Sequence, residues 1–204
     1  MKRPPAPAPA PRDWPVAALA AAGLAVSAYL AWTKWTGGAA LFCESGSGCD
    51  VVQASRYATV FGVPTAAWGV LLYALVIGLA LAGLTPRRWS GAYALTVVAV
   101  AFSAYLTYLS LRVLHAVCPY CLADAGIAVA LLAVLLVRRP AATGKHAPTR
   151  PRRVAALGAA LAVVTVVFAA GVFVADTPTA ASTYQESLAR HLASSGAVFY
   201  GAYW

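Results

Sequence analysis

Charged residues are scarce in this sequence. They make up 10% of its 204 residues, and only six are acidic, whereas 61% of the residues are hydrophobic. Soluble domains carry about 25% charged residues and about 45–50% apolar ones. Since so few charged groups cannot cover a surface that faces water, an ordinary soluble domain is excluded. The mean hydropathy of +0.73 agrees with a chain that has lipid as its solvent.

The sequence also lacks an internal repeat and the alternation of apolar and polar residues that strands in a half-buried sheet require. It has instead long apolar runs rich in Ala and Leu, and a membrane helix needs about 20 such residues. We therefore expect an all-α integral membrane protein, with a four-helix transmembrane bundle and a fifth transmembrane helix. The five predicted spans are 15–32, 64–84, 91–114, 119–137 and 154–174.

The net charge of +9 does not indicate nucleic-acid binding, because the basic residues form short clusters between the apolar runs. Such clusters mark cytoplasmic loops. The Pro/Ala-rich tail 1–14 and the basic linker 138–153 are therefore expected inside, together with Arg87 and Arg88. The loop 33–63 and the residues from 175 onward are expected outside. This topology suits the inner membrane of a bacterium.

The first span does not resemble a cleavable signal peptide. Lys34 and Trp35 follow it where small residues would be needed for cleavage. The bulky Phe42 before Cys43 also argues against a lipoprotein. We therefore expect the first span to be a membrane helix.

Four cysteines form two close pairs, and the predicted topology puts both on the outer side, where disulfides persist. Cys118 and Cys121, the CPYC pair, stand at the mouth of the fourth span. Pro119 suits the first position of a helix. Cys118 is then expected near the N-cap, where free N–H groups and the helix dipole favour a thiolate. Such a pair can cycle between dithiol and disulfide.

Cys43 and Cys49, the loop pair, are separated by Gly- and Ser-rich residues that can close and reopen a short ring. Exchange with the CPYC pair proceeds through a mixed disulfide, and the sequence leaves open which loop cysteine forms it. Two alternatives are a membrane transport or assembly protein with purely structural disulfides, and a four-cysteine zinc site. A CxxC at a helix start is a poor structural staple, and an oxidising compartment disfavours zinc, so we expect no metal.

Around these cysteines the sequence resembles the vitamin K epoxide reductase family in its bacterial branch. The matching residues are Cys43, Cys49, Ser55, Gly62–Pro64, Trp68–Gly69, Tyr73 and Cys118–Cys121. The resemblance covers residues 15–137, and implies a catalytic four-helix bundle around a quinone. It implies that Cys121 lies next to the quinone. It also implies that the loop pair relays electrons to Cys118 from a thioredoxin-like (DsbA-like) dithiol protein or fused domain.

The activity implied by this resemblance is that of a membrane thiol–disulfide oxidoreductase that supports disulfide bond formation. Its acceptor would be ubiquinone, menaquinone or vitamin K, and it could reduce vitamin K epoxide. The residues expected to contact the quinone are Ser55, Phe61, Thr65, Tyr120 and Asp124. Asp124 is an acid inside a span, which is costly and often functional. It would supply a proton or, alternatively, bond only to a neighbouring helix.

The tail carries a second resemblance, to bacterial members with a thioredoxin-like domain fused after the fifth helix. Residues 184–192 are predicted as an amphipathic helix, and 196–204 as a strand that would lead into a W-C-x-x-C site. Residues 175–204 are therefore expected to be the start of such a domain, truncated after Trp204. A naturally short tail is the alternative.

Overall fold

The structure is a computed structural model that describes residues 11–38, 40, 41, 43, 46–141, 148–175 and 183–195. Its helices are α1 (Trp14–Thr36), α2 (Gly48–Ala54), α3 (Thr65–Leu81), α4 (Pro86–Arg112), α5 (Pro119–Val137), α6 (Pro151–Ala175) and α7 (Thr183–Ser194). A 3-10 turn, η1 (Arg56–Ala58), precedes the short antiparallel strands β1 (Thr59–Val60) and β2 (Val63–Pro64). The predicted all-α architecture is confirmed.

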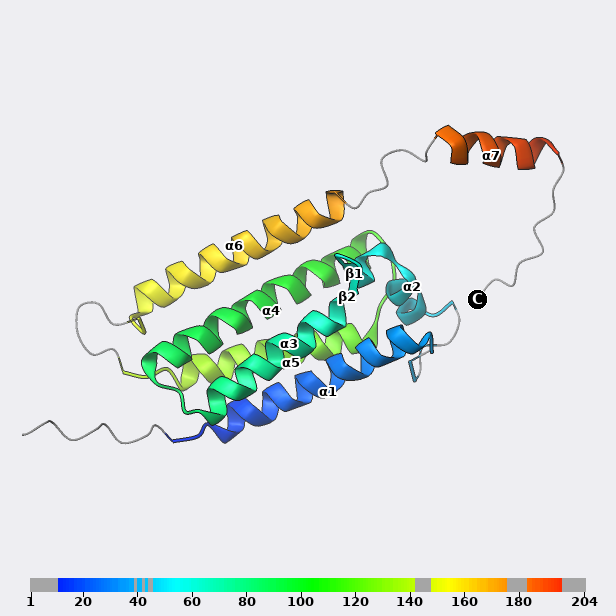
Figure 1. Ribbon diagram of the computed structural model, residues 1–204. Coiled ribbons are helices and arrows are strands. Elements are labelled where there is room, and N and C mark those ends of the chain that lie inside the picture. The colour runs from blue at the N-terminus through cyan, green and yellow to red at the C-terminus, as the bar shows by residue number, and fades with distance from the viewer. Residues whose placement is uncertain are drawn as a thin grey trace, which may run out of the picture.

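Four of these helices, α1, α3, α4 and α5, run side by side as a bundle, and α6 lies along the outside of it (Figure 1). Within the bundle α1 packs against α3 and α5, and α4 packs against α3 and α5 as well as α6. Helices α1, α4, α5 and α6 are each long and apolar enough to cross a membrane. The chain is therefore a multi-pass membrane protein with the predicted four-plus-one arrangement.

The second span is shorter than the predicted range 64–84. Helix α3 has 17 residues, which corresponds to about 25 Å and is near the lower limit for crossing a bilayer. It is shorter because β2 occupies the residue before its start, and because the turn after Leu81 leads directly into the next helix.

The third span begins earlier than the predicted residue 91. The Thr85 hydroxyl accepts a hydrogen bond from the Arg88 N–H (3.4 Å), and Pro86 occupies the first turn. These are the preferred N-cap and N1 residue types. Arg87 and Arg88 thus lie in the first turn of α4. Helix α6 likewise starts at Pro151, so the last residues of the predicted linker 138–153 are helical.

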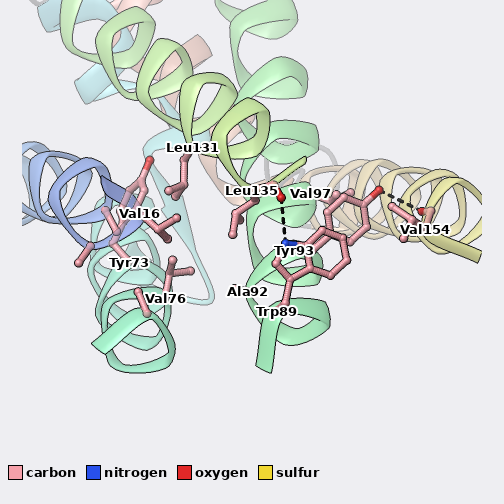
Figure 2. Close-up of a cluster of buried hydrophobic side chains, with 13 residues drawn as sticks. Val16, Tyr73, Val76, Trp89, Ala92, Tyr93, Val97, Leu131, Leu135 and Val154 are labelled. Carbon is pink, nitrogen blue, oxygen red and sulfur yellow. Dashed lines mark hydrogen bonds between the residues drawn. The ribbon is translucent and has the colours of Figure 1, made fainter. Parts of the chain in front are cut away.

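The main hydrophobic core lies between the helices away from the cysteines, and α4 supplies its largest ring (Figure 2). Trp89 is fully buried and donates its indole N–H to the Leu135 carbonyl of α5 (2.8 Å). The neighbouring Tyr93 stacks on Trp89 and donates its hydroxyl to the Val154 carbonyl of α6 (3.0 Å). Two polar groups in a nonpolar solvent are thereby satisfied, and α4 is joined to the helices on both sides of it.

Helices α1 and α3 approach each other closely. A side chain at Gly23 of α1 would collide with the ring of Tyr73 on α3. Small residues at such contacts allow membrane helices to pack tightly. The ring of Tyr73 is held within the bundle as a result and is almost completely buried. Its hydroxyl is therefore available to the interior rather than to lipid.

The two ends of the bundle differ in charge. The start of α1 and the α3–α4 turn lie at one end, and α2 with the two strands lies at the other (Figure 1). At the first end the Arg138 guanidinium contacts the Asp13 carboxylate (3.3 Å). Eight described arginines belong to this end, whereas Arg56 and Arg112 belong to the end that carries α2; the eight are Arg12, Arg87, Arg88, Arg138, Arg139, Arg150, Arg152 and Arg153. This is the segregation that the predicted topology requires.

Helix α7 covers the predicted amphipathic helix 184–192. Most of the predicted tail 1–14, residues 142–147 of the linker and the predicted strand 196–204 lie outside the described residues.

Candidate active site

The cysteines gather in one cluster at the end of the bundle that carries α2. Cys43 and Cys49 form a disulfide with their Cα atoms 5.3 Å apart, whereas Cys118 and Cys121 are free thiols. The Sγ atom of Cys118 lies 4.0 Å from the Sγ atom of Cys49. Their residues are only 1% and 2% exposed. The geometry therefore assigns Cys49 as the loop cysteine that faces Cys118, a point that the sequence leaves open.

The start of α5 presents the CPYC pair. Cys118 is the N-cap residue, Pro119 follows in the first turn, and the Cys121 N–H donates to the Cys118 Sγ atom (3.4 Å). This local geometry confirms the predicted one. The Cys121 side chain lowers the pKa of Cys118 to about 7 through its hydrogen bond; burial opposes this effect, and the N–H groups of Cys121 and Tyr120 add to it. Cys118, which faces the loop pair, therefore ionises to a thiolate more readily at neutral pH than an ordinary cysteine does.

Helix α2 is pressed against the turn before α5, and this contact aligns the two sulfur atoms. A Cβ atom at Gly48 would lie 2.6 Å from the Val117 carbonyl oxygen and 2.7 Å from the Val117 nitrogen. Only a glycine fits there without backbone movement. Since Gly48 and Val117 immediately precede Cys49 and Cys118, their contact determines the separation of the sulfur atoms.

Two tyrosines hold the outer loop above this contact. The Tyr120 hydroxyl donates to the Leu41 carbonyl (2.7 Å), and the Leu41 N–H donates to the Tyr29 hydroxyl (2.8 Å). The two rings lie against each other, with centroids 5.8 Å apart. Both backbone groups of one loop residue are thus fixed by side chains of α1 and α5.

A cavity of about 470 Å³ lies next to the CPYC pair and extends into the bundle. Cys121 lines it, and so do a few polar side chains among mostly apolar ones. These polar residues include Ser27, Thr65, Tyr73, Ser103 and Asp124. Ligand sites for small molecules have this size, an apolar lining and a few polar groups. The lining is suited to a molecule that is mostly apolar and carries a few oxygen atoms.

The carboxylate of Asp124 is at the centre of the polar part of this cavity. It accepts hydrogen bonds from the Tyr73 hydroxyl (3.0 Å) and from the Ser27 hydroxyl (3.5 Å). Both alternatives in the sequence analysis therefore retain support, because Asp124 bonds to neighbouring helices and also faces the cavity. Tyr73 and Ser27 are not among the predicted contact residues. The four-residue spacing of a helix puts Thr65, Gly69 and Tyr73 on one face of α3. This spacing is the signal in the sequence that could have identified Tyr73 as a lining residue.

Of the predicted quinone contacts, Phe61, Thr65 and Asp124 line the cavity. Ser55 and Tyr120 are not among its lining residues. The Ser55 hydroxyl donates to the Val52 carbonyl at the end of α2 (2.7 Å), so it is used in ending that helix. Tyr120 holds the outer loop instead, because its position in the first turn of α5 directs it away from the bundle interior.

Comparison with known proteins agrees with this site. The profile of the Vitamin K epoxide reductase family matches residues 14–137, which include all four cysteines. The chain is also similar to Thiol-disulfide oxidoreductase LTO1 of Arabidopsis thaliana, with 30% identity over 211 residues. That alignment covers 87% of this chain and 53% of the plant protein, so the chain spans about half the length of this relative.

The lowered pKa of Cys118 predicts a pH profile for its alkylation. With the CPYC pair reduced, labelling by iodoacetamide should rise with pH and reach half its maximum near pH 7, because the thiolate fraction passes one half there. An ordinary cysteine has a pKa of about 8.5. In Cys121→Ala the midpoint should move upward, since the largest stabilising hydrogen bond is lost. Mass spectrometry of the Cys118 peptide provides the measurement, and equal midpoints in the two proteins would contradict this account.

The contact of Gly48 predicts that Gly48→Ala slows exchange between the loop pair and the CPYC pair. Displacement of a reacting group by up to 1 Å can cost about 100-fold in rate, and we expect a loss of about 10- to 100-fold. Rapid acid quenching, alkylation and mass spectrometry would measure the exchange rate. Gly38→Ala is a matched control in the same loop, because its Cβ atom would meet only the Thr36 hydroxyl at 3.6 Å. Equal rates in both variants would show that the Gly48 contact does not align the sulfur atoms.

Proposed function

The chain belongs to the vitamin K epoxide reductase family, and we propose that it oxidises protein dithiols outside the membrane and passes their electrons to a lipid quinone. Its role as a membrane thiol oxidoreductase follows from the family and from the similarity to a thiol-disulfide oxidoreductase. The observation that carries the finer proposal is the position of the CPYC pair. Cys118 touches the loop disulfide, and Cys121 lines the cavity.

The relay begins at the loop pair. A thiolate of a thioredoxin-like partner attacks Cys43, and Cys49 leaves as a thiolate. The second partner thiolate then attacks the partner sulfur of this mixed disulfide, so that the partner is oxidised and the loop pair is reduced. We assign Cys43 to the partner because Cys49 already faces Cys118. Two electrons have then entered the loop pair.

The second exchange moves these electrons to the CPYC pair. The Cys49 thiolate attacks Cys118 of the CPYC disulfide, and Cys121 leaves as a thiolate. Cys43 then attacks Cys49 and releases Cys118. The products are a loop disulfide and a CPYC dithiol. The lowered pKa of Cys118 favours its release as a thiolate.

The cavity is where the CPYC dithiol returns to the disulfide. The chemistry that a bound quinone supplies is the acceptance of two electrons and two protons. Cys121 presents its sulfur to the cavity, while Thr65 and the Asp124 carboxyl present polar groups to a ring carbonyl. Asp124 holds a proton at its carboxyl group for delivery, and the hydrogen bond from Tyr73 keeps that group directed toward the cavity. The apolar lining excludes water from this step.

The alternative of purely structural disulfides receives less support. Two purely structural disulfides have no need to meet, whereas the Cys118 sulfur lies 4.0 Å from the Cys49 sulfur and Cys121 lines the cavity. The arginines at the opposite end support an outer position of the cysteines in a bacterial inner membrane. A dithiol partner would then meet the loop pair in an oxidising compartment.

The substitution Cys121→Ala tests the proposed function. With a reduced thioredoxin-like protein as donor, quinone reduction should fall to background, because Cys118 loses the sulfur with which it forms the disulfide. The intrachain disulfide between Cys118 and Cys49 should still form and be detectable by mass spectrometry of unreduced peptides. Cys118→Ala is the comparison, since it should abolish both signals. Undiminished quinone turnover in Cys121→Ala would overturn the scheme.

The substitution Asp124→Asn tests proton delivery. The amide keeps an acceptor for the Tyr73 hydroxyl but cannot release a proton, so quinone reduction should slow by about 100-fold or more. Exchange between the two cysteine pairs should keep its rate, measured by quenching and alkylation. Tyr73→Phe, which keeps the carboxyl group, should have a smaller effect on quinone reduction. An unchanged rate of quinone reduction in Asp124→Asn would contradict proton delivery by Asp124.

A further inference from the structure

The cavity is not confined to the four-helix bundle. Its lining includes Thr165 and Phe168, which belong to α6 on the outside of the bundle. Cys121 and Asp124 come from α5, and most of the remaining lining comes from α3 and α4. Since α6 packs against α4 and not inside the bundle, the cavity passes from the CPYC pair between α3 and α4 to the fifth helix.

The two regions of this cavity differ in polarity. Asp124, Tyr73 and Ser27 are joined by hydrogen bonds at the region that contains Cys121. Toward α6 the lining is formed by large apolar side chains, among them Phe61, Trp68 and Phe168. Trp68 and Phe168 are 46% and 58% exposed, and they belong to the apolar helices α3 and α6. A ligand that fills the whole cavity therefore needs a polar head and a hydrocarbon tail.

An aromatic contact connects α6 to the hairpin between β1 and β2. Phe61 and Gly62 form the two-residue turn, with φ angles of 54° and 75°. The left-handed region is unfavourable for a bulky residue, so the surroundings must hold Phe61 there. Its ring lies 6.3 Å from that of Phe168, between centroids. The indole N–H of Trp68 donates to the Val60 carbonyl (3.5 Å), which ties the hairpin to α3.

Contacts near both ends of helix α6 hold it against the bundle. Near its start the Val154 carbonyl accepts the Tyr93 hydroxyl (3.0 Å), as Figure 2 shows. Near its end the Phe173 ring contacts those of Tyr57 and Tyr105, with centroids 5.2 Å and 6.2 Å away. Thr165 and Phe168 lie between these two attachments. Their position relative to the cavity is thus determined by packing and not by the linker alone.

We infer that α6 is the outer wall of a tail subsite, and that Phe168, Thr165 and Phe61 bind the prenyl side chain of a lipid quinone. This inference rests on the proposed function, which directs the quinone ring toward Cys121. The tail then runs between α3 and α4 and along α6 into the membrane. The fifth helix thereby determines which quinones are preferred, because a ring without a tail makes no use of this subsite.

Photolabelling tests the subsite without relying on turnover. The full chain in lipid nanodiscs is irradiated with a quinone that carries a diazirine at the end of its prenyl chain, and labelled residues are identified by mass spectrometry. We expect labels near Thr165 and Phe168 on α6 and near Phe61, reduced by excess unlabelled prenylated quinone. Labels spread over the lipid-facing residues of all helices, or absent from α6, would overturn the inference.

A pair of variants on α6 sharpens the test. Phe168→Ala should raise the ratio of KM for a prenylated quinone to KM for a tail-less naphthoquinone by about tenfold, and should weaken the α6 label. Val167→Ala is the matched control, since Val167 is 65% exposed and is not among the lining residues. An equal effect on both quinones would overturn the tail subsite. If the unmodified protein labels on α6 but reduces neither quinone, the proposed function fails while the subsite stands.

Discussion

The contact between the start of α5 and the outer loop is the constraint on which the site depends. It brings Cys118 against Cys49, and the helix then carries Cys121 one turn further, to the cavity. Two sulfur atoms on one turn of helix therefore face two different environments. One faces a protein disulfide at the membrane surface, and the other faces an apolar cavity. The close approach of Gly48 to Val117 keeps the first of these contacts short.

Buried polar side chains need hydrogen-bond partners within the protein, because lipid offers none. Trp89 and Tyr93 each place their single polar atom on a backbone carbonyl of a neighbouring helix. Asp124 differs from these two residues, because its hydrogen-bonded carboxyl group also faces the cavity. An acid in that position is costly unless it has a use. Its location beside Cys121 suits a reaction that consumes protons where electrons are delivered.

The fifth helix gives this bundle an asymmetry that four helices alone would not have. Helix α6 packs against α4 and contributes Thr165 and Phe168 to the cavity lining, while the hairpin contacts α6 through Phe61 and Phe168. The cavity is consequently lined by protein on the side of α4 where α6 packs. This arrangement links the part of the chain beyond the matched range 14–137 to the cavity within it.

The sequence by itself determined the fold class, the approximate spans and the helix start at the CPYC pair. Apolar runs of membrane length favour helices, and Pro119 just after Cys118 suits the first position of a helix, where its missing N–H costs nothing. Only the tertiary structure decided which loop cysteine meets Cys118. It also showed that the Ser55 and Tyr120 hydroxyls bond to the Val52 and Leu41 carbonyls and do not line the cavity. It also brought Thr165 and Phe168 to the cavity. These are contacts between residues far apart along the chain, and helical periodicity shows which residues share a face but not which helix that face meets.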